Sequence, residues 1–164
     1  MKLSPQGLHL IASFEGYVPV PYNDSADNAT VGYGHLIHTG PVTEHDRAVY
    51  HGYTTGQLLT LLNRDAGNAV AAVNESVKVR LGVIPARAQA RFDALVSLAF
   101  NIGGGAFAGS TLVRTINAKG APRDWTAIGP LWVGWDHDGG KVVPGLLTRR
   151  QREFAIFRTG KYPS

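Results

Sequence analysis

The 164-residue chain contains no cysteine. Without thiols it has no disulfide framework, no thiolate metal site and no cysteine nucleophile. A thiol-free protein can fold in a reducing or an oxidising compartment, so this absence leaves the location of the protein open. The 44% share of hydrophobic residues, spread through periodic segments, favours a folded globular chain over a disordered one.

The chain also lacks a long uninterrupted hydrophobic run. Residues 94–113 carry no charged side chain and are about long enough to span a bilayer. However, Asn101 and the three glycines from Gly103 onward indicate the end of one helix, a turn and the start of another. Residues 3–14 are interrupted by polar side chains, and no small-residue cleavage site follows them. We therefore expect neither a signal peptide nor membrane insertion.

Acidic residues are scarce in the C-terminal segment. From Lys141 onward the chain has six basic residues and one acidic residue, Glu153, while the whole chain carries a formal charge of +4. The positive charge therefore belongs to this segment, and the rest of the chain is close to neutral. Such a surface attracts polyanions, which include nucleic acids and an anionic cell envelope.

Hydrophobic periodicity and capping residues predict a mainly helical α+β protein. Turn-forming and strand-forming residues between Val18 and Ile37 indicate a small antiparallel sheet. The segment 40–52 is predicted to be a loop with at most one helical turn. We expect the following helices: Pro5 to about Gly16, about 55–78 behind a capping box at Thr54, Pro85 to about Phe100, one capped by Ser110, one capped by Asp124 near Trp125, and Gly145 to Thr159 with its arginines facing outward.

Two carboxylates near the N-terminus could carry acid-base chemistry. Helical spacing places Glu15 on the apolar face of its helix, where partial desolvation suits a general acid. Asp24 follows in a turn-forming segment, where hydrogen bonds and water would keep it ionised. Such a pair is typical of glycoside cleavage, with Thr30 available to hold a water molecule. Asp27 and Asp46 are each more simply explained as a turn residue or an exposed charge.

The spacing of these residues resembles the phage-type lysozymes, the endolysin family that includes the T-even bacteriophage lysozyme. Glu15, Asp24 and Thr30 are followed by Gly-Tyr-Gly-His-Leu at 32–36. The resemblance runs from about Leu8 to Gly160, in the same order as in the family. The further matches are Phe100-Asn101-Ile102-Gly103, Phe107, Ser110-Thr111-Leu112, Gly145-Leu146, Arg149-Arg150, Glu153 and Phe157-Arg158-Thr159-Gly160.

The resemblance implies a single lysozyme domain over 1–164 with a two-lobed fold. A small sheet lobe at about 16–54 and a helical lobe at about 79–164, which includes the N-terminal helix, would be joined by the helix at 55–78. It further implies hydrolysis of the β-1,4 bond between N-acetylmuramic acid and N-acetylglucosamine in the glycan strands of peptidoglycan. In that family pattern, Glu15 is the proton donor, Asp24 the second catalytic carboxylate and Thr30 the residue that positions water.

Other family roles carry over to matching positions. Arg149 matches the arginine that pairs with the catalytic Glu. His35 and Asp65 match an ion pair that bridges the sheet and the long helix. The positions that contact sugar in the family are Leu36, Phe100 and Ser110.

Two segments depart from the family pattern. Most members have Gly between the catalytic Asp and Thr, where the turn needs a left-handed residue, but this chain has Asp27-Asn28. Both residues tolerate that conformation, so we expect a similar turn. The segment 136–141 is predicted to form a hairpin, as in the lambdoid branch of the family.

Several alternatives remain open at this stage. His35, His38, His45 and His51 could suggest a zinc amidase, although no metal or other cofactor is expected. A nucleic-acid binder would draw on the basic last helix and on the tryptophans, which are more simply explained as surface and core. A lytic transglycosylase would cleave the same bond but needs no water-holding Asp. If the protein is a hydrolase, we expect inversion at the anomeric carbon and a monomeric protein. We further expect that it stays in the bacterial cytoplasm until a pore such as a holin admits it to the wall.

Overall fold

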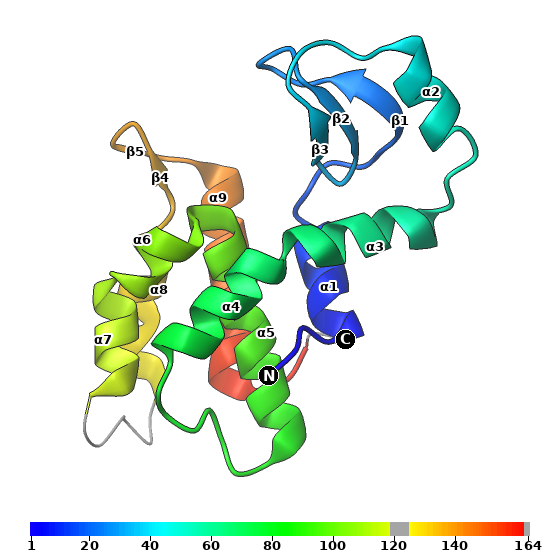
Figure 1. The fold of residues 1–164 in the computed structure, drawn as a ribbon. Coiled ribbons are helices and arrows are strands. Elements are labelled where there is room, and N and C mark those ends of the chain that lie inside the picture. Colours follow the sequence, from blue (N-terminus) through cyan, green and yellow to red (C-terminus); the bar gives the residue numbers. More distant parts are fainter. Residues whose placement is uncertain (119–124, 163–164) are drawn as a thin grey trace. The chain divides into compact units, whose positions relative to one another are not determined.

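The computed structural model describes residues 1–118 and 125–162 (Figure 1). It is mainly helical and contains a small three-stranded antiparallel sheet, which confirms the predicted fold class. No helix in these ranges is long and apolar enough to cross a membrane. The elements are α1 (Pro5–Ala12), β1 (Val18–Asn23), β2 (Ala29–Gly32), β3 (His35–His38), α2 (Glu44–Tyr50), α3 (Thr55–Asp65), α4 (Gly67–Ser76), α5 (Pro85–Ile102), α6 (Gly104–Ala108), α7 (Thr111–Asn117), η1 (Trp125–Ile128), α8 (Gly129–Val133), β4 (His137–Asp138), β5 (Lys141–Val142) and α9 (Pro144–Thr159).

The chain divides into two compact units. One unit comprises Leu8–Gly67 and contains the sheet, and the other comprises Met1–Gly7 together with Asn68–Ser164. The sheet unit is larger than the predicted lobe at 16–54, because most of α1 and all of α3 belong to it. That residues 1–164 form one lysozyme domain stays a prediction.

The sheet unit is built around β2, which lies between β1 and β3 in an antiparallel meander. Every residue of β2 is buried, and Leu58 and Leu62 of α3 are buried against the strands. Gly32 ends β2 with φ +68, and a Cβ there would lie 3.1 Å from Leu58 Cδ2. A glycine is therefore needed both for the backbone conformation and for the close approach of α3.

Helix α2 corrects the prediction of a loop over 40–52. Thr43 caps this helix, because its side chain accepts a hydrogen bond from the Asp46 N–H while the Asp46 side chain accepts one from the Thr43 N–H. This capping box uses Asp at the position where Glu or Gln is usual, which is why the pattern was missed. Asp46 is 4% exposed, so its reading as an exposed charge was wrong.

The long helix predicted at 55–78 is present as two consecutive helices. Thr54 and Gln57 form the predicted capping box at the start of α3. Ala66 interrupts the helix before α4 begins at Gly67, although the Ala66 N–H still donates to the Leu62 carbonyl oxygen. Gly67 adds backbone freedom at this point, and the boundary between the two compact units follows it.

The helical unit is centred on α5, whose residues from Phe92 to Ala99 are all buried and against which α9 packs. The Trp132 ring of α8 is fully buried with its centroid 5.0 Å from that of Phe157 in α9. Ser110 caps α7, and β4 and β5 form the predicted hairpin. The predicted cap Asp124 lies outside the described residues.

A buried carboxylate ties the first residues of the chain to α5. Asp93 is fully buried and accepts hydrogen bonds from the Ser4 N–H, the Ser4 hydroxyl and the Gln89 amide, as well as from the Tyr162 hydroxyl. A Cβ on Gly7 would lie 2.5 Å from Asp93 Cγ, so only glycine fits there. The two ends of the described chain are thereby joined within the helical unit.

The last helix corrects the prediction that its arginines face outward. Arg149 is 4% exposed and Arg150 is fully buried, whereas Arg152 and Arg158 are exposed. The two buried guanidinium groups surround the fully buried Glu153, which compensates one of their charges. The basic surface of the C-terminal segment is therefore smaller than its composition suggests.

Candidate active site

Glu15 lies just beyond α1 and not within it, because the helix ends at Ala12 instead of near Gly16. Its N–H still donates to the Ile11 carbonyl oxygen at 3.3 Å, which continues the helical hydrogen-bond pattern for one more turn. Glu15 is half-buried. This placement agrees with the expected partial desolvation of a carboxyl group at a helix end.

Asp24 begins the turn between β1 and β2. Its Oδ1 atom accepts hydrogen bonds from the Ala26 N–H at 2.8 Å and from the Asn28 N–H at 2.9 Å. The bond from the Asn28 backbone lowers the pKa of Asp24 below its ordinary value, because it stabilises the ionised form. Asp24 is therefore a carboxylate near neutral pH, as expected from its turn-forming segment.

Asp27 takes the left-handed position that this turn requires, with φ +60. Its N–H donates to the Asp24 carbonyl oxygen at 3.0 Å, and its Oδ1 atom accepts a hydrogen bond from the Asn23 side chain at 2.8 Å. Asp is among the few residues other than glycine that adopt this conformation readily. The turn therefore forms without the glycine that the family pattern has here.

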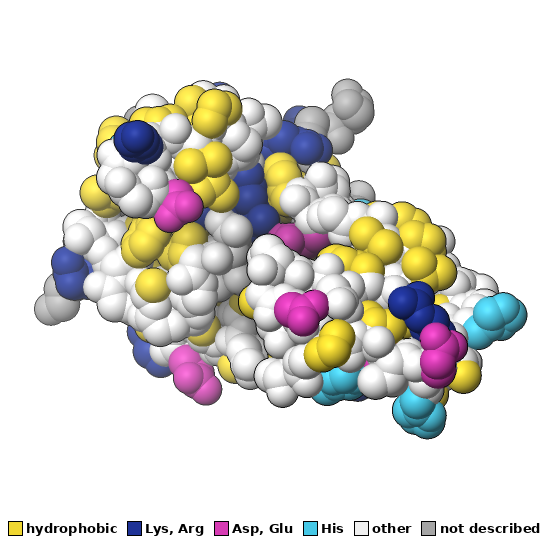
Figure 2. All heavy atoms as spheres, turned by 90° about the horizontal axis from the view of Figure 1, so that it is seen from above, with side chains coloured by type: hydrophobic (Ala, Val, Ile, Leu, Met, Phe, Trp, Pro, Cys, Tyr) yellow, Lys and Arg dark blue, Asp and Glu magenta, His cyan; other side chains and the backbone are white. Residues whose placement is uncertain are grey.

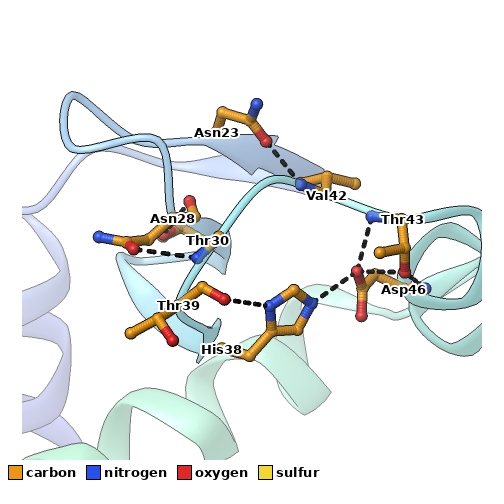
Figure 3. Close-up of polar contacts among 9 residues, drawn as sticks. Asn23, Asn28, Thr30, His38, Thr39, Val42, Thr43 and Asp46 are labelled. Atoms are coloured by element: carbon orange, nitrogen blue, oxygen red, sulfur yellow. Dashed lines mark hydrogen bonds and ion pairs between the residues drawn. The ribbon is translucent and has the colours of Figure 1, made fainter.

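Thr30 is buried in the middle of β2. Its hydroxyl donates to the Asn28 carbonyl oxygen at 3.2 Å, as Figure 3 shows. The same carbonyl oxygen accepts a hydrogen bond from the Asp24 N–H at 2.9 Å, so Asn28 connects Asp24 to Thr30. Asn28 was expected only as a turn residue, and this link was not predicted, although its position between two candidate catalytic residues was a signal.

Leu36 lies on β3 opposite Thr30, and it is 50% exposed. A large exposed aliphatic side chain beside a candidate catalytic residue is suited to contact with a sugar ring. Phe100 and Ser110 belong to the helical unit. Phe100 is half-buried near the end of α5, and Ser110 is buried with its hydroxyl oxygen accepting from the Val113 N–H at 3.1 Å.

The predicted pair of His35 and Asp65 is present, with 2.8 Å between His35 Nδ1 and Asp65 Oδ2. A third member was missed: the Arg64 guanidinium donates to His35 Nε2 at 3.0 Å. Because arginine can only donate, Nε2 must accept and Nδ1 must carry the proton that His35 gives to Asp65. The bridge between β3 and α3 is therefore a three-residue chain.

His38 occupies a second polar cluster, at the end of β3 (Figure 3). Its Nε2 atom lies 2.9 Å from Asp46 Oδ2 and its Nδ1 atom 3.0 Å from the Thr39 carbonyl oxygen. The bond to the Thr39 backbone, followed by the bond to Asp46, raises the pKa of His38 above its ordinary value. Hydrogen bonds from Thr43 and His38 hold the pKa of Asp46 well below its usual range.

The four histidines that suggested a zinc site do not gather around one point. His35 is bonded to Asp65 and His38 to Asp46, while His45 and His51 are exposed. Figure 2 shows histidine side chains at separate places on one face of the molecule. In the part of the chain that the structure describes, no group of three His, Asp or Glu residues could hold a metal ion.

Arg149 is held inside the helical unit by Glu153. Its Nε atom donates to Glu153 Oε1 at 3.1 Å, and its Nη2 atom donates to the Ser97 carbonyl oxygen at 3.3 Å. Glu153 also accepts hydrogen bonds from the Ser97 hydroxyl at 2.6 Å and from the Trp132 indole at 3.2 Å. Burial lowers the pKa of the neighbouring Arg150 to about 10.

Known proteins resemble this chain over nearly its whole length. The family model "Phage lysozyme" matches residues 12–153. The endolysin of Salmonella phage P22 is 35% identical over 157 residues, which cover 96% of this chain and 98% of that protein. The endolysin of Bacillus phage B103 is 34% identical over 169 residues, which cover 98% of this chain but only 56% of that protein. The chain thus spans little more than half the length of some relatives.

Solved structures give the same result. The endolysin of Escherichia coli O157:H7 phage FAHEc1 superposes with a TM-score of 0.78 at 34% identity, covering 100% of this chain and 98% of that one. The muramidase domain of SpmX from Asticaccaulis excentricus has a TM-score of 0.72 at 31% identity, covering 95% and 97% of the two chains. The matched family model and these relatives confirm the resemblance to the phage-type lysozymes. The chain belongs to the phage lysozyme family.

Proposed function

We propose that this protein is an endolysin-type lysozyme, which hydrolyses the β-1,4 bond between N-acetylmuramic acid and N-acetylglucosamine in bacterial peptidoglycan. Its family and the endolysin and muramidase names of its relatives support this function. The observation that carries the proposal is the contrast between two carboxyl groups. Glu15 is half-buried at a helix end, and Asp24 is held as a carboxylate by backbone N–H groups.

The proposed roles follow from this contrast. Glu15 donates a proton to the leaving glycosidic oxygen, and Asp24 acts through water or the developing positive charge on the sugar. Thr30 positions the water, and Asn28 fixes the distance between Asp24 and Thr30 through its backbone. A water-mediated role for Asp24 corresponds to inversion at the anomeric carbon.

The remaining predicted site residues have supporting roles in this proposal. Leu36, Phe100 and Ser110 contact the glycan strand. Arg149 has the role of the matching family arginine, and the chain of His35, Asp65 and Arg64 holds β3 against α3. No cofactor is part of the proposed reaction.

Matched substitutions test the two carboxylates. Glu15→Gln and Asp24→Asn should each lower the rate of peptidoglycan lysis about 100-fold or more, because each removes one acid-base group. Glu44→Gln removes an exposed carboxylate from α2. Asp27→Asn removes a carboxylate from the turn that carries Asp24, and asparagine can adopt the left-handed conformation of Asp27. These two controls should keep the wild-type rate, with circular dichroism confirming the fold. Full lysis by Glu15→Gln would refute the proposal.

A zinc amidase is the alternative from a different class of cell-wall enzyme. Such an enzyme would lose activity in excess EDTA and would release peptides instead of sugars. We expect lysis to be undiminished in EDTA, since the four histidines of the sheet unit have other partners or are exposed.

The proposed setting is that of an endolysin. The protein would be a monomer, kept in the bacterial cytoplasm until a separate membrane pore such as a holin admits it to the wall. Several relatives bear the name endolysin, which supports this setting. Expression of the protein in a bacterial host should leave the cells intact until a pore-forming protein is co-expressed, and lysis without the pore would contradict the proposal.

A further inference from the structure

The loop at 39–43 is bonded to both sides of the turn that carries Asp24. The Val42 N–H donates to Asn23 Oδ1 at 2.8 Å, just before Asp24, and the Gly40 N–H donates to Asn28 Oδ1 at 3.2 Å, just after it. The Gly40 carbonyl oxygen also accepts from the Ala29 N–H at 2.8 Å. Figure 3 shows this loop lying beside the ends of the strands that the turn connects. The position of the turn therefore depends on the position of the loop.

The loop is in turn held by one charged pair. Asp46 Oδ2 accepts hydrogen bonds from the Thr43 N–H at 2.8 Å and from the Thr43 hydroxyl at 2.6 Å, so it fixes the end of the loop. The same oxygen lies 2.9 Å from His38 Nε2. His38 Nδ1 lies 3.0 Å from the Thr39 carbonyl oxygen, which fixes the beginning of the loop. His38 thus contacts the beginning of the loop directly and its end through Asp46.

Each of the two acceptors around His38 needs a proton on the ring nitrogen that faces it: Nδ1 for the Thr39 carbonyl oxygen and Nε2 for Asp46. A backbone carbonyl oxygen and a carboxylate only accept, so the two ring nitrogens can satisfy both at once only as the doubly protonated imidazolium. The neutral ring has one N–H and loses one of the two bonds. Asp46 is the charged group that contacts His38 in the described structure, while Glu44 and Arg47 on the same helix pair with each other at 3.7 Å.

We propose that His38 is a positioning residue for the proposed lysozyme reaction. In its protonated form it ties Thr39 to Asp46 and so braces the loop at 39–43, which holds the turn bearing Asp24 through Asn23 and Asn28. Loss of the proton loosens the loop and with it the placement of Asp24 relative to Thr30. The inference rests on the proposed function, because it assumes that Asp24 takes part in the reaction.

The first test is the pH dependence of turnover. For the wild type, kcat on soluble glycan fragments should fall about five- to tenfold as the pH rises through the raised pKa of His38, because one charge-assisted hydrogen bond is lost. His38→Gln should have the lower kcat at every pH and lack this step, with little change in KM. The matched control is His45→Gln, an exposed histidine on α2, which should keep the wild-type profile.

A double substitution separates positioning from a general loss of stability. Asn28→Ala keeps the backbone hydrogen bonds of the turn but removes the Oδ1 acceptor for the Gly40 N–H. If His38 acts through the loop, His38→Gln should lower kcat several-fold in the wild type and by a smaller factor in Asn28→Ala, where the bonds of Val42 to Asn23 and of Ala29 to Gly40 remain. An equal loss in both backgrounds would overturn the proposal.

A measurement without turnover provides an independent readout. In the wild type, the amide resonance of Asn28 should shift with the same midpoint as the ring protons of His38 in an NMR titration, whereas amides of α7 should not. The proposal is overturned if the ring titrates while the Asn28 amide does not respond. Glu15→Gln identifies the other failure: if that variant still lyses peptidoglycan, the proposed function is wrong irrespective of His38.

Discussion

Removal of the Glu153 carboxylate should be among the most destabilising single changes in the helical unit. In Glu153→Gln, the buried guanidinium groups of Arg149 and Arg150 lose the charge that compensates them, and the new amide N–H group faces donors from Trp132 or Arg150. Breaking a buried ion pair in this way costs about 3–5 kcal/mol. The free energy of unfolding of a whole domain is only about 5–15 kcal/mol, so this substitution would remove a large part of it.

The assay is urea denaturation followed by tryptophan fluorescence, since all three tryptophans of the chain lie in the helical unit. Arg150→Met/Glu153→Met removes one charge of each sign and leaves the net charge of the cluster unchanged. It should recover part of the lost stability, because the buried charge of Arg150 is removed together with that of Glu153, although Arg149 still loses its bond to Glu153. This role of Glu153 is refuted if Glu153→Gln unfolds at the same urea concentration as the wild type, or if the double variant is less stable than the single one.

Three further predictions concern local features. Tyr162→Phe should lower the free energy of unfolding by about 1.5–3 kcal/mol through the lost bond to buried Asp93. Tyr17→Phe, whose hydroxyl contacts Thr55 at the surface, should change it by less than about 0.5 kcal/mol when urea denaturation of both variants is followed by circular dichroism. Asp27→Ala should lower the free energy of unfolding of the sheet unit by about 1 kcal/mol, because alanine is disfavoured at φ +60. Asp27→Gly should not lower it, and an equal loss of stability in both variants would contradict this explanation. The melting temperature of the sheet unit should fall as the pH rises above about 6.5 and through the raised pKa of His38. A group whose pKa is higher in the folded state stabilises the fold only while it is protonated, so this fall should be absent in His38→Gln.

Features set by neighbouring residues in the chain were predictable from the sequence. The small sheet, the capping box at Thr54 and the helix starts at Pro5 and Pro85 depend on short-range interactions, and they were found at the expected positions. The left-handed turn residue at Asp27 was also expected, because Asp tolerates that conformation. Helix α2 was missed because its capping box has Asp46 in place of Glu or Gln.

Features set by tertiary packing were not predictable in the same way. Helical periodicity marks arginine as a surface residue, and it gave no sign that Arg149 and Arg150 would be buried around Glu153. The donation from Arg64 to His35 likewise depends on how α3 meets β3. The assignment of catalytic roles to Glu15, Asp24 and Thr30 stays a prediction, supported by family membership and by the hydrogen bonds around Asp24.

The central claim is that the chain cleaves the glycan strand by adding water. The most direct test is digestion of purified peptidoglycan in ¹⁸O-labelled water, followed by mass spectrometry of the released muropeptides. We predict N-acetylmuramic acid at a reducing end, with one ¹⁸O atom incorporated per bond cleaved. Products that are lighter by one water, without ¹⁸O and with a 1,6-anhydro ring, would contradict hydrolysis and establish a lytic transglycosylase instead.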